Sequence, residues 1–520
     1  MADPTSQGLN LRGVGPSGVS RALVLLLAFG AAPPEPPGAV ATPEPTPPKE
    51  APGATAEPSP RPAAEEPPIP TVVVTGTRAP RPVRDVPATV VVLPRAEIDR
   101  SPTLTTDDLL RTVPSVGTFR RSSSLVADPT SQGLNLRGVG PSGVSRALVL
   151  LDGVPVNDPF GGWVYWRALP RLGLDRIEIV PGGGSASYGN YALGGVVQLF
   201  SRPIAPATLE GDVLAGHPGT LLLGARVTER WGRVGAELEG EWLESAGYPL
   251  VPEAERGAID VPAASRHGTL NGRVEVALTD TLTLTLRAGS FGERQSGGTA
   301  FTNASVGRLG YSAGVRRSGG DGGTLELSFF GHAQRFRQQR ARISADRSTE
   351  ALSAEQDVPT DDQGASFVWT GAPAALLGTH SLVAGAELRR ISGVSRERLF
   401  PASTAPGSLV GRDGGGEQQF GALFAQDLYS VSPSVQLLGA LRLDLWRNLG
   451  ASRTLTRADG TRETVAFDER RHAQLNPRLG VLYRPVEWLG LRASGYRAFR
   501  APTLNELYRP FQVGTILTAA

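Results

Sequence analysis

The amino-acid sequence predicts a membrane β-barrel of antiparallel strands, with a smaller α+β domain before it. Two observations carry this prediction. After about residue 203, long stretches alternate apolar and polar residues with a period of two, which is typical of strands with an apolar partner on one side only. Between residues 71 and 202, short β-branched runs alternate with one helix-like stretch and with glycine turns, which is typical of a compact α+β domain.

The stretch Arg233–Trp242 illustrates the alternation. Val234, Leu238 and Trp242 share one face of the expected strand, and the three glutamates of the stretch share the other. Tight turns are expected at Thr279–Asp280 and Ser432–Pro433. The same split continues in four further stretches: Leu270–Leu278, Leu282–Ala288, Leu325–Ala333 and Phe420–Trp446.

Either lipid or a second sheet could cover the apolar face, so a soluble β-sandwich is an alternative to the membrane barrel. Two details favour lipid. Short turns are expected to alternate with long polar loops, such as Arg340–Gly364 and Ser392–Gln418, as they do in outer-membrane barrels. The charged residues at inward-type positions are also too numerous for the dry core of a sandwich.

Composition excludes several classes of protein. The chain has 52 Lys and Arg against 50 Asp and Glu, a formal charge of +2, which gives no support to nucleic-acid binding. Cysteine is absent, which excludes disulfides, thiolate metal sites and cysteine nucleophiles. No nucleophile motif is found, so no enzyme activity and no cofactor are expected. Five histidines lack metal-ligand spacing and are expected on the surface or in loops: His217, His267, His332, His380 and His472.

Five segments are expected along the chain. Residues 1–32 contain an apolar run of signal-peptide length, and residues 33–70 form a proline-rich disordered linker. Residues 71–78 lead into the α+β domain at 79–203, and a partial barrel occupies 204–520. Residues 2–26 recur without change at residues 127–151, which indicates a recent duplication, a recombination or an assembly error rather than a structural repeat.

Three local patterns in the α+β domain predict structure rather than a binding or catalytic site. A helix is expected at Thr106–Thr112. The glycines of Pro181–Gly184 lack the Gly-Lys-Ser/Thr ending of a phosphate-binding loop, and no helix is expected after them. Arg137 and Asp152 are expected to form an interior ion pair or a contact with the barrel, not a catalytic pair.

Several motifs along the chain occur in a characteristic order. The segment TVVVT at Thr71–Thr75, between the proline-rich linker and GTR, resembles the TonB box of the TonB-dependent receptors, and the alternative is a first strand of the domain. The stretch Leu475–Pro510, with GYRAFRAPTLNELY, resembles the late-barrel signature of the family. Five segments resemble its plug domain: Val86–Asp99, Thr105–Val116, Leu134–Gly140, Leu148–Asp158 and Arg176–Arg202.

The resemblance implies a plug domain inside the lumen of a barrel, and active uptake of a scarce ligand across the bacterial outer membrane. The ligand would be a ferric siderophore, cobalamin or a similar molecule. The resemblance also implies TonB as a partner, together with ExbB and ExbD, and outer-membrane lipid around the barrel. The residues implied in TonB binding are Thr71, Val72, Val73, Val74 and Thr75.

The region 204–520 accommodates roughly 14 to 16 strands, whereas plugged transporters of this class close with 22. The barrel is therefore expected to be incomplete and the chain truncated at its C-terminal end. A truncated, non-functional receptor remnant is the main alternative to a working receptor. A passive porin is a further alternative, but it would lack the plug and the TonB box.

Two plug loops are candidate ligand contacts. The first is the polar loop Arg120–Ser124, in which Arg120, Arg121 and Ser122 would bind an anionic or oxygen-rich chelate; a solvated loop is the alternative. The second is an aromatic run, for which packing against the barrel wall is the alternative. Its members are Phe160, Trp163, Tyr165 and Trp166.

Overall fold

The structure, a computed structural model, describes residues 73–74, 78, 81–120, 122–140, 143–319, 323–486, 488–513 and 516–518. All of them belong to the second of two compact units, Ile69–Ala520. The expected signal segment, the linker, the first copy of the duplicated segment, and Thr71, Val72, Thr75 and Arg121 lie outside the described residues. None of the described helices is long and apolar enough to cross a membrane.

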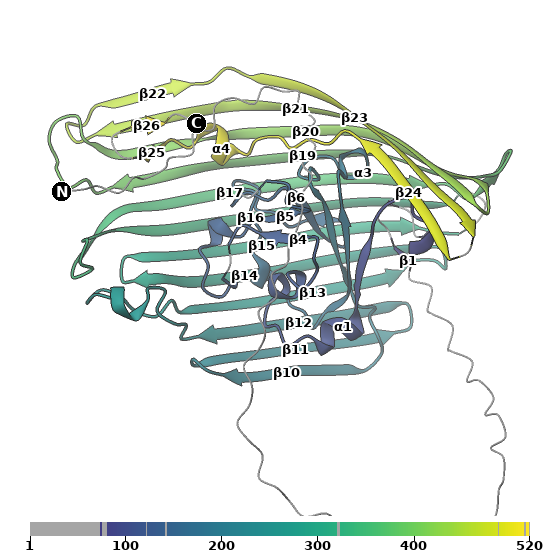
Figure 1. Ribbon diagram of the computed structural model, residues 1–520, viewed down its shortest axis with the longest axis horizontal. Helices are drawn as coiled ribbons and strands as arrows, with labels where there is room; N and C mark the ends of the chain where they lie inside the picture. The colour runs from purple at the N-terminus through teal and green to yellow at the C-terminus, as the bar shows by residue number, and fades with distance from the viewer. Residues whose placement is uncertain are drawn as a thin grey trace, which may run out of the picture. The chain divides into compact units, whose positions relative to one another are not determined.

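One antiparallel sheet of 15 strands dominates the described residues, and its strands pair in chain order (Figure 1). Short β18 (Ala374–Ala375) and β22 (Arg462–Ala466) pair beside the main path, with β19 and β21. The main path consists of β10 (Thr208–Gly216), β11 (Thr220–Trp231), β12 (Val234–Ser245), β13 (Ser265–Ala277), β14 (Leu282–Thr299), β15 (Thr302–Arg317), β16 (Thr324–Ile343), β17 (Glu350–Thr370), β19 (Thr379–Leu399), β20 (Leu409–Ser432), β21 (Val435–Arg457), β23 (Arg470–Val486) and β24 (Leu489–Tyr496). The antiparallel sheet agrees with the predicted fold class, and its strand count lies within the expected range.

The two faces of this sheet differ as the alternation predicted. In β12, Leu238 is 54% exposed and Trp242 is 42% exposed, whereas Glu239 between them is buried. We call the side with the exposed apolar residues the outer face and the opposite side the inner face. Apolar side chains facing outward are the arrangement expected for strands surrounded by lipid.

The prediction of two long polar loops, at Arg340–Gly364 and Ser392–Gln418, is wrong. Strand β16 continues to Ile343 and β17 begins at Glu350, so only residues 344–349 connect them. Likewise, β19 reaches Leu399 and β20 begins at Leu409. The polar stretches are therefore strand extensions beyond the apolar part of the sheet, where both faces carry polar side chains and the period-two pattern fades.

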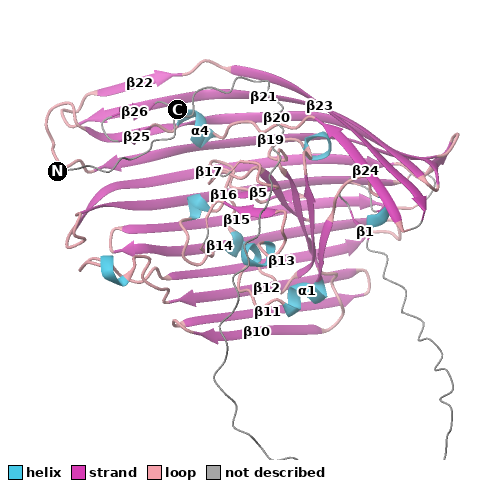
Figure 2. Cartoon of the chain, viewed as in Figure 1, coloured by secondary structure: helices cyan, strands magenta, loops and turns pink. Residues whose placement is uncertain are grey.

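The α+β domain contains a mixed sheet of five strands in the order β3-β8-β9-β6-β7. Only the β6–β9 pair is parallel. The helices are few and short (Figure 2). The sheet is formed by β3 (Val91–Pro94), β6 (Ala147–Leu151), β7 (Val154–Pro155), β8 (Leu174–Pro181) and β9 (Gly195–Ser201).

Short elements complete the structure. Helix α2 begins at Thr106 as predicted, whereas α3 after the glycines of Pro181–Gly184 was not expected. The helices are η1 (Val83–Asp85), α1 (Arg95–Arg100), α2 (Thr106–Leu110), η2 (Pro129–Ser131), η3 (Trp166–Ala168), α3 (Ser185–Tyr188), η4 (Glu253–Glu255) and α4 (Leu504–Tyr508). The remaining strands form two-stranded pairs: β1 (Val73–Val74) with β2 (Arg81–Pro82), β4 (Val116–Thr118) with β5 (Leu134–Leu136), and β25 (Phe511–Val513) with β26 (Ile516–Thr518).

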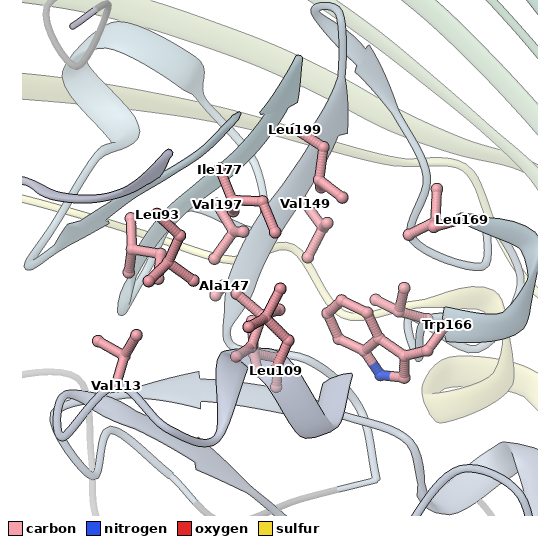
Figure 3. Packing of buried hydrophobic residues seen from close by; sticks show 14 of the residues in the cluster. Leu93, Leu109, Val113, Ala147, Val149, Trp166, Leu169, Ile177, Val197 and Leu199 are labelled. Carbon is pink, nitrogen blue, oxygen red and sulfur yellow. The ribbon is translucent and has the colours of Figure 1, made fainter. Parts of the chain in front are cut away.

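The core of the α+β domain lies on one face of its sheet. Figure 3 shows Leu109 and Trp166 against apolar side chains of the sheet, among them Ala147 and Val149. All four are buried. Gly195 begins the central strand β9 with a φ of 142°, and a Cβ there would lie 2.3 Å from the Val180 carbonyl oxygen. A side chain at this position would disrupt the domain, because both the backbone angle and the close approach require glycine.

Candidate functional site: the α+β domain and its contacts with the large sheet

The segment before the α+β domain forms a small sheet of its own. Val73 pairs with Pro82 and Val74 with Arg81, antiparallel. This pair is not joined to the five-stranded sheet of the domain. The segment that resembles a TonB box is therefore not an edge strand of that sheet, and it can leave without removing a strand from the domain.

Arg78 fixes the chain just after this segment to the large sheet. Its guanidinium forms an ion pair with Glu387 of β19. It also lies over the rings of Tyr188 and Phe424, 4.6 and 4.4 Å from their centroids. Arg442 Nη2 of β21 donates to the other oxygen of Glu387 at 2.7 Å. We call Arg78, Glu387 and Arg442 the Arg78 anchor; its cation is held by a carboxylate and two aromatic faces together.

The next residues continue along the same part of the sheet. Arg81 donates to the Ser381 hydroxyl of β19. Arg484 of β23 donates to Asp85 at 2.8 Å, and Arg492 of β24 donates to the Val86 carbonyl at 3.2 Å. The chain between the box-like segment and the domain is thus attached to the inner face by polar contacts, and η1 itself buries no residue, whereas Val86 just after it is buried.

Charged contacts also join the body of the domain to the sheet. Asp152 forms a 2.7 Å ion pair with Arg287, which confirms the expected contact between this residue and the barrel. Arg137 does not pair with Asp152; it donates to the Thr89 hydroxyl at 3.0 Å. Arg167 forms an ion pair with Glu293 in which each side chain is only 1% exposed. Such buried pairs fix orientation, because a misplaced partner would leave an unpaired charge.

The aromatic run lies between the domain and the sheet. Phe160, Trp163 and Tyr165 pack in one cluster with sheet residues, and Trp163 meets Phe336 edge-to-face at 5.9 Å between centroids. Trp166 lies instead in the core of the domain. All four aromatic residues are at most 5% exposed. This placement agrees with the packing alternative for Phe160, Trp163 and Tyr165, whereas Trp166 packs within its own domain.

Asp158 contacts this aromatic cluster through Tyr165. The Tyr165 hydroxyl donates to it at 2.9 Å, Gln334 of β16 at 2.5 Å and the Gly161 N–H at 2.6 Å. Burial raises the pKa of Asp158 above its ordinary value, and these donors offset only part of that effect. The Asp158 carboxyl is therefore buried and connects the domain to the sheet by hydrogen bonds.

Arg120 is neither a solvated side chain nor a free cation. It is buried and forms a 2.7 Å ion pair with Asp107, whose second oxygen accepts from the Ser124 hydroxyl at 2.7 Å. Burial raises the pKa of Asp107, but the charge of Arg120 and the hydrogen bonds from Ser124 and Arg120 outweigh it, so this pKa lies below its ordinary value. Ser122 is half-buried, and its carbonyl accepts from Arg120.

Replacing Arg120 with glutamine is expected to lower the free energy of unfolding of the α+β domain by about 3 kcal/mol at pH 7, because a buried carboxylate loses its partner. The lowered pKa of Asp107 means that the ion pair stabilises the fold above the unfolded pKa of about 4 and ceases to do so as pH falls through the folded pKa. The gap between wild type and R120Q should therefore narrow at pH 3. Tryptophan fluorescence during chemical denaturation measures the free energy of unfolding of both proteins.

The matched control is R111Q, because Arg111 forms a more exposed 3.3 Å ion pair with Asp108 in the same region. Its effect should stay below about 0.5 kcal/mol. An R120Q effect no larger than that of R111Q would contradict the structural role of Arg120.

A second cationic group on the inner face was not foreseen from the sequence. Glu397 of β19 forms ion pairs with both Arg412 and Arg509, each with an N–O distance of 2.5 Å. Nearby on β16, Arg340 donates to Gln338, and Gln338 donates to Asp128 of the α+β domain at 2.6 Å. Arg509 follows helix α4, at the end of the stretch Leu475–Pro510, whereas Arg340, Glu397 and Arg412 come from three strands and meet through the register of the sheet, so no local pattern predicts that the group forms.

The expectation for the histidines is wrong for two of them. His267 and His332 are buried on strands β13 and β16 rather than in surface loops, and each faces a carboxylate, Glu241 and Asp362. Inward-facing strand positions explain this, since polar side chains line the inner face. Among the described residues, no group of His, Asp and Glu has the arrangement of a metal site.

Two cavities lie between the domain and the sheet. One, of about 440 Å³, is lined by the whole Arg78 anchor together with Tyr188, Phe330 and Asp444. The other, of about 150 Å³, is lined by Leu169, Glu239, Phe291 and His332 among others. The first cavity matters more, because the ion pair that fixes the N-terminal segment forms part of its wall.

A small α+β domain held by ion pairs against the inner face of a large antiparallel sheet defines a plugged barrel receptor. Residues 82–196 match the family model of the TonB-dependent receptor plug domain, and residues 255–519 match that of the TonB-dependent receptor-like β-barrel. The matches cover more than half of the chain, and the chain belongs to the TonB-dependent receptors. From here we call the α+β domain the plug and the large sheet the barrel wall.

Individual relatives are more distant. The vitamin B12 transporter BtuB of Vibrio vulnificus (strain YJ016) is 32% identical over 133 residues, 26% of this chain and 21% of the relative. BtuB of Photobacterium profundum is 27% identical over 176 residues, 32% of this chain and 28% of the relative. These aligned segments span less than a third of either transporter.

Solved structures share the fold. The unliganded ferric citrate transporter FecA has a TM-score of 0.63 at 16% identity, over 80% of this chain and 64% of that chain. The open form of the ferric-catecholate import receptor Fiu from E. coli K12 also has a TM-score of 0.63, at 14% identity, over 81% of this chain and 71% of that chain. This chain thus spans just under two thirds of FecA.

Proposed function

We propose that this protein takes up a scarce ligand across the bacterial outer membrane, with energy delivered by TonB. The observation that supports this most is the arrangement before the plug. The box-like segment stands outside the sheet of the plug, and the chain just after it is attached to the barrel wall by the Arg78 anchor. Tension applied at the box would reach this polar attachment before it reached the apolar core of the plug.

In this proposal TonB, working with ExbB and ExbD, binds Thr71–Thr75 by adding it as a strand to its own sheet. Tension would then separate Arg78 from Glu387 and widen the 440 Å³ cavity that both residues line. Polar contacts suit such a step, because water replaces each broken ion pair and hydrogen bond as it opens. The ligand would pass between the plug and the barrel wall.

The proposed ligand is an anionic or oxygen-rich metal chelate. Arg412 on the inner face and Arg509 after helix α4 both pair with one carboxylate, Glu397. Arg340 donates to Gln338, which contacts the plug residue Asp128. Guanidinium groups in excess of carboxylates favour an anionic ligand. Among the similar proteins, a mutant of the ferric enterobactin receptor PfeA of Pseudomonas aeruginosa was solved in complex with enterobactin, and BtuB is named as a vitamin B12 transporter. Cobalamin is therefore the second candidate, and Arg121 and Ser122 stay proposed contacts.

Uptake by cells that express the full chain and lack their own receptors tests the proposal. Ferric citrate, ferric enterobactin and cyanocobalamin serve as labelled probes, in strains with and without TonB. We expect uptake of at least one probe to depend on TonB and to fall to background in its absence. Uptake of every probe at equal rates without TonB would favour a porin. No uptake, with the protein present in the outer-membrane fraction, would contradict the transport proposal.

A further inference from the structure

A row of polar side chains crosses the outer face of the barrel wall. Cross-strand partners lie on the same face of a sheet, so the register of the strands places the whole row on one side. Leu270, four residues from Arg266 on β13, and Leu309, four residues from Ser305 on β15, lie on this face and are 51% and 62% exposed. The row from β12 to β20 is Glu244, Arg266, Arg294, Ser305, Arg337, Asp357, Arg396 and Asp413.

Arginine dominates this row and its immediate neighbours. We call six residues the arginine belt: Arg266, Arg294, Arg335, Arg337, Arg396 and Arg398. Glu244 pairs with Arg266 and Glu355 with Arg398, and Asp413 is the cross-strand neighbour of Arg396. Together with Asp357, these four carboxylates meet six guanidinium groups, so positive charge is in excess. Asp357 itself faces three arginines, with N–O distances of 2.6 Å to Arg335, 3.3 Å to Arg337 and 4.0 Å to Arg396. The side chains of these three arginines are also more than half exposed, so their remaining donors are available to a ligand.

A groove of about 1120 Å³ is lined by all six arginines of the belt. Its lining also includes inward-facing residues of the same strands, and these side chains are buried, for example Gln295, Gln338 and Glu397. Because the inward side chains are covered, the open space lies on the outer side, where the arginines are exposed. The groove is therefore a feature of the outer face and is distinct from the space between plug and barrel wall.

The belt lies at one edge of the apolar part of the outer face. On β19, Leu388 is 65% exposed, and Arg396 and Arg398 follow toward the end of the strand. The connections at this end include residues 246–264 and 400–408, whereas the opposite end has tight turns such as 433–434. Longer loops mark the extracellular end of outer-membrane barrels. The belt thus occupies the level of lipid headgroups in the outer leaflet.

We propose that the arginine belt binds the phosphate groups of an outer-leaflet lipid headgroup. Guanidinium groups bind phosphate through paired charge-assisted hydrogen bonds, and several of them at the headgroup level attract anionic lipids. The groove receives the headgroup, while the exposed leucines below contact the acyl chains. This inference rests on the proposed location in the outer membrane, but it concerns the outer face and does not depend on transport.

The test uses the purified full chain in detergent micelles and measures binding of lipid A with and without its phosphates. The test variant is R337Q/R396Q. The control variant is R233Q/R317Q, which removes two exposed arginines at the opposite end of the sheet. We expect lipid A to bind R337Q/R396Q about 30-fold more weakly than wild type, and the control less than twofold more weakly. Circular dichroism checks that both variants keep their β-structure.

Three outcomes would overturn the inference. Equal affinity of R337Q/R396Q and wild type for lipid A would show that the arginine belt does not bind lipid A. Equal affinity of wild type for lipid A and its dephosphorylated form would show that phosphate is not recognised. Displacement of lipid A by inorganic phosphate at the same concentration would assign the site to a soluble anion. Because no transport is measured, a failure of uptake leaves this result unaffected.

Discussion

Proline at Val74 is expected to abolish binding of the full chain to the C-terminal domain of TonB, with at least a 100-fold loss of affinity. Strand addition depends on backbone N–H and C=O groups, and proline removes the N–H and restricts the preceding residue. Val74 already pairs as a strand with Arg81, so its backbone can take the extended conformation that such binding requires. Isothermal titration calorimetry on purified protein measures the affinity.

The control for this prediction is V74A, which shortens the side chain and leaves the backbone donor intact. It should weaken TonB binding by less than fivefold, since specificity pockets contribute less than the main-chain bonds in strand addition. Uptake of the probes should follow binding in both variants. If V74P bound TonB with unchanged affinity, Thr71–Thr75 would not be the segment that binds TonB.

Replacing Arg78 with glutamine is expected to raise the amide hydrogen-exchange rates of residues 81–86 about 30-fold. The change leaves Glu387 with Arg442 alone and removes a cation from two aromatic faces. Breaking a fully buried pair costs about 3–5 kcal/mol, and we expect about 2 kcal/mol because the two side chains are 12% and 24% exposed. That difference corresponds to the stated increase in local opening.

The matched control is R84Q. Arg84 is 74% exposed and makes only a 3.9 Å contact with Asp85, so exchange in the same segment should change less than twofold. R78K should restore part of the protection, because lysine keeps the charge but not the planar contact with the rings. Equal exchange in R78Q and R84Q would mean that the Arg78 anchor does not hold the segment.

The parts of the barrel strands that have one apolar face could be predicted from the sequence, whereas the polar ends of the same strands could not. Around Leu238 and Trp242 one face is apolar, so alternation identifies both the strand and its faces. In Arg340–Gly364 polar side chains lie on both faces, and Gln338 just before this stretch contacts the plug on the inner side. Composition in such a stretch is that of a loop, and only cross-strand hydrogen bonding shows that it is a strand.

The candidate site was predictable only in part, for a related reason. Motifs located the plug and the box-like segment, and Asp152 was correctly expected to contact the barrel. The Arg78 anchor joins residues more than 300 positions apart, and no local pattern indicates which arginine meets which glutamate. The sequence makes Arg120 a candidate ligand contact because its guanidinium group is adjacent to that of Arg121, and no local pattern indicates its ion pair with Asp107, on a helix 13 positions earlier.

The direction of strand pairing gives the plug two different mechanical responses. A pull from the N-terminal end separates the antiparallel β1–β2 pair one residue at a time, since the load falls on a single rung. Strands β6 and β9 are parallel over five residue pairs, from Ala147 with Gly195 to Leu151 with Leu199. Tension between them acts in shear on all five pairs together. In the proposed uptake mechanism, a pull on the N-terminal segment would therefore separate the β1–β2 pair more readily than the β6–β9 pair.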